Sequence, residues 1–177
     1  MNAYHLAKLV EWAGTLKTRK RLQKVVYLLR HAGCPLNVDF TLHHYGPYSH
    51  DVAQRADAMV QAGLLEEEET SNTIGRSFSY KLSQTARQQL NNMDNAIRQK
   101  YEEFDRFKPL AQQLLQHDLQ KLEFSATIAY FRNQGQGRTW LTAREAASKF
   151  KNQEPNGQDM RDAEGLAKQV LEWEIPG

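Results

Sequence analysis

The sequence predicts a mainly α-helical protein with one small β-hairpin. Apolar residues recur at spacings of three and four along most of the 177-residue chain, which is the period of an amphipathic helix. Residues 64–69 and 76–83 instead form two strand-like runs around a polar turn, and apolar and polar residues alternate cleanly in the second. Beyond about residue 84 only helical patterns follow, so the strands are expected in the first half of the chain.

The composition is that of an ordinary globular protein. Hydrophobic residues make up 40% and charged residues 25% of the chain, which argues against disorder and low complexity. The single cysteine, Cys34, has no second thiol with which to form a disulfide, so a cytoplasmic location is expected. No apolar run approaches the roughly 18 residues that a membrane span needs, and no secretory leader is recognisable. We therefore expect a soluble protein.

Two amphipathic helices are predicted at the start of the chain. The first covers residues 4–13 and ends at Gly14. The second follows Thr18, whose hydroxyl is suited to cap a helix N-terminus, and it ends before Gly33 and Pro35. Its apolar residues gather on one face, namely Leu22, Val25, Val26 and Leu29.

A short strand, a turn and a third helix come next. Residues 38–45 alternate apolar and polar side chains and are predicted to be a strand, which Gly46-Pro47 turns. Ser49 is a good N-cap, and Asp51 places a carboxylate in the first turn, where it suits the positive end of the helix dipole. This helix is expected to end at Gly63.

The hairpin that follows predicts the fold of the first half. A helix ending in Gly63-Leu64-Leu65, a charged hairpin with its turn at residues 70–75, and a new helix capped by Ser83 form the usual ending of a winged helix. We therefore predict a winged-helix-like domain over residues 1–90. One feature departs from a DNA-binding winged helix: a strand and a turn precede the third helix, which weakens the usual presentation of that helix to the major groove.

The second half is predicted to be a helical unit, residues 91–177, packed on the first domain or extending from it. One helix is expected over residues 85–104, ending or kinking before Pro109. Further helices are expected over residues 110–121, 124–134, 142–150 and 159–174. Thr142 and Glu145 have the spacing of a capping box for the third of these.

Several segments together resemble a known family. Residues 21–28 (RLQKVVYL), 45–49 (YGPYS) and 63–65 (GLL), with 122–128 (LEFSATI) and 145–147 (EAA), are similar to the YwgA-like family of uncharacterised bacterial proteins. That resemblance covers most of the chain and implies no function. More distantly, LQKVVYLL followed by YGP resembles the Panacea domain of SocA-like bacterial antitoxins over the first half. This second resemblance implies neutralisation of a toxin by protein contact.

Positive charge gathers near the N-terminus. Residues 1–60 contain eight Lys and Arg against four Asp and Glu. On a helical wheel Lys17, Lys20 and Lys24 share the face opposite the apolar stripe, together with Tyr27, and Arg21 lies beside them. Such a face could follow a phosphate backbone, so Lys17, Lys20, Arg21 and Lys24 are predicted nucleic-acid-binding residues. The alternative is that these charges only solvate the outer face of an amphipathic helix.

Other surfaces are less suited to nucleic acid. The predicted third helix offers Arg55 against Asp51 and Asp57. The hairpin carries Glu66, Glu67, Glu68 and Glu69, which would repel phosphates. A nucleic-acid partner is therefore expected on the lysine face, and not on the third helix or the hairpin.

The stretch LHHYGPYSH, residues 42–50, crowds three histidines and two tyrosines around the Gly-Pro turn. In a strand His43 and His44 point to opposite faces, so they cannot ligate one ion together, and no metal-binding spacing is present. We expect neither a metal nor another cofactor here. The stretch is predicted to be a structural corner, with Tyr45, Tyr48 and His50 as the residues of a protein-interaction site.

The sequence therefore predicts a non-enzymatic regulatory or interaction protein, and two kinds of partner stay open. Catalytic fingerprints are not found, and Cys34 beside Pro35 is interpreted as a packing residue. The first hypothesis is DNA binding through the lysine face. The second is an antitoxin-like module that neutralises a toxin-like partner protein. The helical second half could also hold a homodimer, so the oligomeric state stays open as well.

Overall fold

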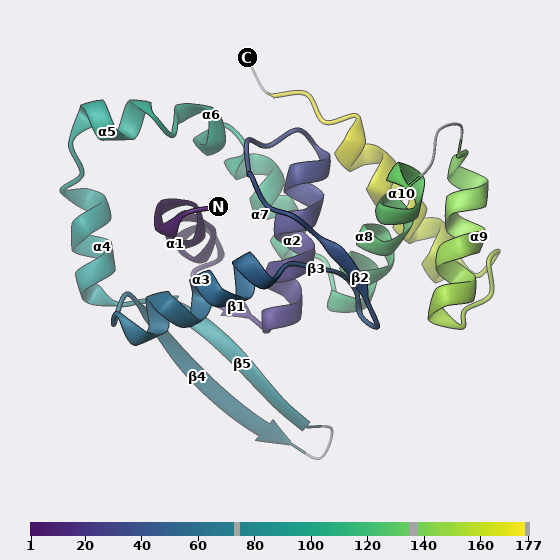
Figure 1. Ribbon diagram of the computed structural model, residues 1–177, viewed down its shortest axis with the longest axis horizontal. Coiled ribbons are helices and arrows are strands. Elements are labelled where there is room, and N and C mark those ends of the chain that lie inside the picture. Colours follow the sequence, from purple (N-terminus) through teal and green to yellow (C-terminus); the bar gives the residue numbers. More distant parts are fainter. Residues whose placement is uncertain (73–74, 135–137, 176–177) are drawn as a thin grey trace.

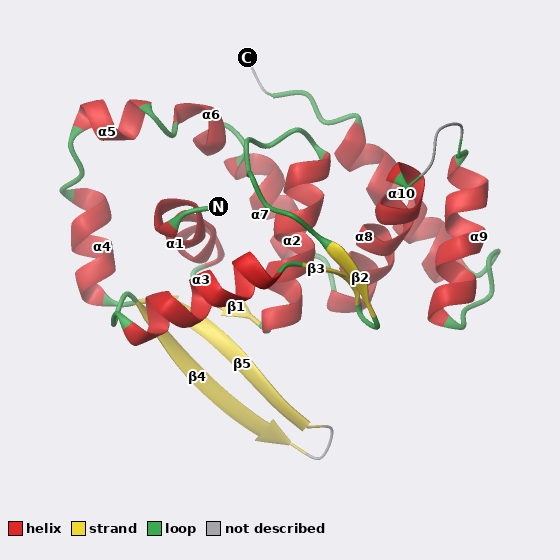
Figure 2. Cartoon of the chain, in the orientation of Figure 1, coloured by secondary structure: helices red, strands yellow, loops and turns green. Residues whose placement is uncertain are grey.

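Helices dominate the computed structural model, which describes residues 1–72, 75–134 and 138–175. Figure 2 shows the small antiparallel sheet at one edge of the helical body and a separate, short two-stranded ribbon among the helices. The predicted mainly helical fold with a small β-hairpin is therefore confirmed.

The first half follows the predicted order of two helices, a strand, a helix and a hairpin, with two further short strands, β1 (Leu16–Lys17) and β3 (Gly46–Tyr48), that were not predicted. It runs α1 (Ala3–Ala13), β1, α2 (Arg19–His31), β2 (Thr41–His43), β3, α3 (His50–Gln61), β4 (Leu65–Asn72) and β5 (Gly75–Leu82). The predicted caps are confirmed, because Thr18 accepts from Arg21 N and Ser49 accepts from Val52 N. The predicted strand over residues 38–45 is shorter in the structure, because only Thr41–His43 pair with β3.

The hairpin β4–β5 projects from the helical body (Figure 1). Its strands pair in register from Leu65 opposite Leu82 outward, and β1 joins the other edge of β5, so that the order in the sheet is β1-β5-β4. Leu65, Leu82 and Tyr80 are buried at its base, which anchors the hairpin to the core. The predicted turn includes residues 73–74, which lie outside the described residues.

The second half is helical, but its first predicted helix is wrong. In place of one helix over residues 85–104 the structure has α4 (Gln84–Asn91), α5 (Asn95–Gln99) and α6 (Glu102–Asp105), which form an arc around the end of α1 (Figure 1). Local hydrogen bonds explain the break. Asp94 caps α5 by accepting from Ala96 N, and the Arg98 guanidinium donates to the carbonyls of Leu90, Asn91 and Met93, which compensates for ending α4 there.

The remaining helices are α7 (Lys108–Gln116), α8 (Leu119–Asn133), α9 (Trp140–Lys151) and α10 (Gln158–Leu171). Pro109 lies in the first turn of α7, where its missing N–H leaves no helical bond unmade. The predicted cap of α9 is wrong by three residues. Thr139 is the N-cap and Thr142 is its capping-box partner, so the helix begins earlier than the Thr142–Glu145 pair indicated.

Helix α2 lies at the centre of the core, and every residue from Leu22 to Leu29 is buried. The helix packs against α7, α8 and α10 of the second half, and against α3 and the strand β3 of the first. The main hydrophobic cluster accordingly draws residues from both halves of the chain, among them Leu6, Val26, Leu122 and Val170. Because α2 is covered on several sides, Lys24 is buried where the sequence pattern predicted solvent.

Candidate interaction site

The Gly-Pro corner is a tight two-stranded ribbon. Strands β2 and β3 pair antiparallel, with Thr41 opposite Tyr48 and His43 opposite Gly46, and His44 and Tyr45 form the loop between them. Gly46 has a φ of 89°, in the region that favours glycine. A Cβ at this position would lie 2.5 Å from the Thr127 Oγ1 of α8, so glycine also lets the ribbon approach that helix closely.

Helix α2 fixes the ribbon through two buried side chains. Gln23 makes a double hydrogen bond with the backbone of Ser49: its Nε2 donates to the carbonyl oxygen at 2.9 Å, and its Oε1 accepts from the N–H at 2.8 Å. Lys24 Nζ donates to the carbonyl oxygen of Pro47 at 2.7 Å. The Ser49 carbonyl oxygen also accepts from Ala53 N in the first turn of α3, so Gln23 ties the ribbon to the point where that helix begins.

The C-terminal half contacts the same ribbon. Lys151, at the end of α9, forms an ion pair with Glu123 of α8, and its Nζ also donates to the carbonyl oxygen of His44 at 3.0 Å. Lys151 and Glu123 are largely buried. The ribbon is therefore held by α2 and by the α8–α9 pair together.

Lys24 is the most strongly perturbed charge of this region. Its side chain is 2% exposed, and burial lowers the pKa of its amine from 10.5 to about 7. Glu123 opposes this shift, whereas the positive charges of Lys151 and Lys20 add to it. Because Glu123 is already paired with Lys151, it compensates Lys24 only in part.

Aromatic side chains form the outer surface of the corner. The His43 ring stacks on Tyr48 with centroids 4.7 Å apart, and His50 meets Tyr48 edge to face at 5.1 Å. On the other side of the loop, Lys20 Nζ lies 3.2 Å from the centroid of the Tyr45 ring, which is a cation–π contact. Tyr45 is 49% exposed.

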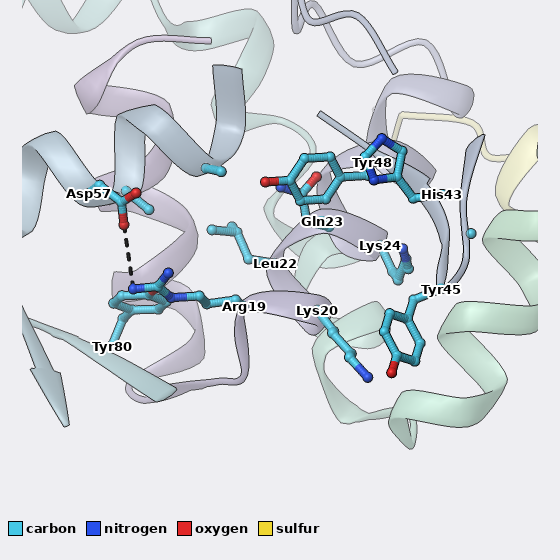
Figure 3. Close-up of a pocket in the computed structure, with 13 residues that line it drawn as sticks. Arg19, Lys20, Leu22, Gln23, Lys24, His43, Tyr45, Tyr48, Asp57 and Tyr80 are labelled. Carbon is cyan, nitrogen blue, oxygen red and sulfur yellow. Dashed lines mark ion pairs between the residues drawn. The ribbon is translucent and has the colours of Figure 1, made fainter. Parts of the chain in front are cut away.

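These groups surround a pocket of about 230 Å³, which we call the corner pocket. Figure 3 shows Lys20 and Tyr45 at one end, and Arg19 with Asp57 and Tyr80 at the other. At that far end Arg19 forms ion pairs with Asp57 at 3.4 Å and with Glu67 at 2.8 Å. The pocket is lined by Arg19, Lys20, Leu22, Gln23, Lys24, His43, Tyr45, Gly46, Tyr48, Ala53, Ala56, Asp57 and Tyr80.

The predicted lysine face is not a continuous exposed surface. Lys17 and Lys20 are exposed, but Lys17 lies on β1, before the start of α2. Arg21 is half-buried and donates to the carbonyl oxygens of Leu115 and His117. Lys24 and Tyr27 are buried, so the prediction that they face solvent is wrong. The reason is that α8 and the ribbon cover this face of α2.

The predicted interaction residues do lie together. Tyr45 and Tyr48 line the corner pocket, and His50 contacts Tyr48 at its margin. Sequence reasoning did not identify Arg19, Asp57 or Tyr80 as pocket residues, nor Glu123 and Lys151 as supports of the ribbon. No local pattern marks them, because each reaches the corner through contacts between elements distant in sequence.

The histidines and the cysteine do not suggest metal or thiol chemistry. In the described part of the chain, no group of three His, Cys, Asp or Glu side chains is placed to hold a metal ion. Cys34 is buried, and burial raises the pKa of its thiol to about 12, so the thiol stays protonated at neutral pH. This environment fits its interpretation as a packing residue.

Among residues 1–72, 75–134 and 138–175, the structure contains no helix with both the length and the apolar character that crossing a bilayer requires.

No family model matches the chain. The chain is similar to the uncharacterised protein YwgA of Bacillus subtilis (strain 168), with 30% identity over 80 residues. The matched region is 45% of this chain and 47% of YwgA, so the chain spans about half the length of the curated relative it matches. The likeness to YwgA is thus supported over part of the chain, and the more distant Panacea resemblance stays a prediction.

Proposed function

We propose that the protein is a non-enzymatic regulatory protein that binds another protein through the corner pocket, as an antitoxin-like module would. One observation carries the proposal. A single pocket joins the exposed Tyr45 ring, the Tyr48 ring and the Lys20 ammonium, on a ribbon that both halves of the chain hold in place. Tyrosine is among the residue types enriched at protein interfaces, and aromatic side chains in well-packed pockets carry much of the binding energy there.

We further propose that residues 1–90 are a winged-helix-like body adapted to protein binding. Apart from the ribbon β2–β3, which is inserted between α2 and α3, the order is α1, β1, α2, α3, β4, β5. This order and the sheet order β1-β5-β4 support the proposal, because the strand after the first helix pairs with the last strand of the hairpin. The exposed residues of α3 include Asp51, Arg55 and Asp57, and β4 carries its glutamates. This distribution of charge is poorly suited to duplex DNA.

Site-specific photocrosslinking tests the protein-binding proposal. A benzoylphenylalanine in place of Tyr45 is expected to crosslink one defined protein in the source cell, because the ring at this position is exposed at the mouth of the pocket. The matched control carries the same probe in place of Leu141, which is 51% exposed on α9 and does not line the corner pocket. After mass spectrometry identifies the partner, Tyr48→Ala should abolish its binding to the purified protein. Equal crosslinking from both positions, or undiminished binding by Tyr48→Ala, would contradict the proposal.

Nucleic-acid binding is the second candidate, and a different groove favours it. The start of α2 and the hairpin enclose a groove of about 460 Å³ that includes Arg19, Lys20, Arg76 and the Phe78 ring. Exposed Lys17 lies on the neighbouring strand β1. The Phe78 ring is partly exposed, with the Arg19 guanidinium over it. Cations beside an accessible aromatic ring are typical of single-strand binding surfaces.

Oligonucleotide binding tests this second candidate. The double variant Lys17→Ala/Lys20→Ala is expected to bind a fluorescent single-stranded oligonucleotide at least about tenfold more weakly and with a smaller salt dependence, because two phosphate contacts are lost. Fluorescence anisotropy over a series of salt concentrations measures both quantities. The matched control is Lys100→Ala/Lys108→Ala, which removes two other exposed lysines. If both double variants lose the same affinity, the binding reflects only net charge and the groove is not the site.

A further inference from the structure

The walls of the corner pocket select for an apolar group. Leu22, Ala53 and Ala56 contribute aliphatic surface from α2 and α3, and the rings of Tyr45 and Tyr48 add aromatic surface from the ribbon. The Gln23 amide is occupied by its two hydrogen bonds to the Ser49 backbone. A group that enters the pocket therefore gains by burying carbon.

The charges around the pocket are unequally compensated. The Arg19 guanidinium is paired with both Asp57 and Glu67. Lys24 is buried, and its amine donates to Pro47 O. Lys20 differs from both: its ammonium is exposed and rests on the Tyr45 ring, and within the described part of the chain no ion pair with a carboxylate engages it. Lys24 forms no such ion pair either, but it is buried beneath the ribbon. The mouth of the pocket thus carries one positive charge without a negative partner.

We propose that the corner pocket binds a single carboxylate attached to an apolar or aromatic group, presented by the partner protein as an acidic residue beside an apolar one. The carboxylate pairs with the Lys20 ammonium, and the apolar group lies against Leu22 and Tyr48. This inference rests on the proposed protein-binding function and specifies the chemistry that the partner must present.

Charge complementarity favours this ligand over the alternatives. A positively charged group would be repelled by Lys20. A neutral group would shield the Lys20 ammonium from water without supplying an opposite charge. A doubly charged phosphate would bring two negative charges to the single exposed ammonium at the mouth of the pocket, whereas a carboxylate brings one. A monoanion with an apolar body matches both the charge and the walls.

Small probes test the ligand chemistry on the full-length protein. Phenylacetate, phenylacetamide and phenyl phosphate share a ring and differ in charge. In spectra of methyl-labelled protein, phenylacetate should shift the Leu22, Ala53 and Ala56 methyl signals in a saturable manner, and phenylacetamide should bind at least about tenfold more weakly. Lys20→Gln should weaken the binding of phenylacetate by a similar factor. Lys17→Gln, an exposed neighbour that does not line the pocket, should leave its affinity unchanged.

The possible outcomes separate this inference from the function on which it rests. Equal binding of phenylacetate and phenylacetamide, or full affinity in Lys20→Gln, would refute the carboxylate assignment. Tighter binding of phenyl phosphate would point to nucleic acid and refute it too. If the Tyr45 probe captures a partner while phenylacetate fails to bind, protein binding stands and only the ligand chemistry is wrong. If phenylacetate binds as described but no partner crosslinks, the pocket takes a free carboxylate, and both the protein-binding proposal and the protein origin of the carboxylate fail.

Discussion

Gly46→Ala is expected to destabilise the protein by roughly 3 kcal/mol, of which about 1–2 kcal/mol comes from the left-handed backbone and the rest from overpacking. The backbone at Gly46 has a φ of 89°, and the new methyl group would lie 2.5 Å from Thr127 Oγ1. The threonine cannot easily move away, because its hydroxyl is buried on α8 and donates to Glu123 O at 2.7 Å. Urea unfolding followed by circular dichroism measures the loss.

Two further variants show which cause dominates. Gly33→Ala is the matched control, because Gly33 has a φ of 88° but nothing within 4 Å of the added Cβ; it should cost only about 1 kcal/mol. Thr127→Ala removes the opposing oxygen, so the double variant Gly46→Ala/Thr127→Ala should be more stable than the sum of the single losses predicts, by about 1 kcal/mol or more. Equal losses at Gly46 and Gly33 would show that close packing on α8 does not matter.

Lys24 is expected to make the stability of the protein rise with pH above neutrality. In the unfolded chain its amine keeps its proton up to a pKa of about 10.5, whereas in the fold burial lowers that pKa to about 7. Between these values the unfolded state binds more protons, so raising the pH favours the fold, and below about pH 7 the cost of burying the charge is present in full. From about pH 7 to about pH 9 the free energy of unfolding should gain about 2 kcal/mol from this group.

Lys24→Met tests this contribution because it keeps an unbranched side chain and removes the amine. The free energy of unfolding of the wild-type protein minus that of Lys24→Met should rise by about 2 kcal/mol between about pH 7 and about pH 9. Lys17→Met, which removes an exposed ammonium, is the matched control, and the comparison isolates the effect of burial. A wild-type curve parallel to that of Lys24→Met over this range would mean that the amine is hydrated in the fold.

Local signals predicted the first half of the fold well. Helices α1, α2 and α3 begin and end close to the predicted residues. Thr18 caps α2 and Ser49 caps α3, and Gly14, Gly33 and Gly63 follow the ends of the three helices in turn. The hairpin was also predicted, since alternation along β5 is a short-range pattern. The prediction failed at residues 85–104, where Asp94 and Arg98 make side-chain bonds to the backbone that periodicity does not reveal.

The candidate site was predicted only in part. Tyr45, Tyr48 and His50 gather at one corner because they are close in sequence around Gly46-Pro47. The exposure of the lysine side chains could not be predicted from neighbouring residues in this way. Lys20 and Lys24 lie one turn apart on α2, yet Lys20 is exposed and Lys24 is 2% exposed. Lys24 lies under the ribbon and bonds to Pro47 O, whereas Lys20 rests on the exposed Tyr45 ring.

The sequence by itself determined the elements of the first half, their caps, and the aromatic corner, because these depend on interactions within a few residues of chain. Only the tertiary structure decided what the corner can do. Helix α8 packs against α2 and the ribbon, and α9 contacts the ribbon through the bond from Lys151 to His44, about a hundred positions away in the chain. This packing removes Lys24 from water. Lys20 stays exposed, without a carboxylate partner among the described residues. The chemical character of a lysine is set by its solvent and neighbouring charges, and those are fixed only when distant segments meet.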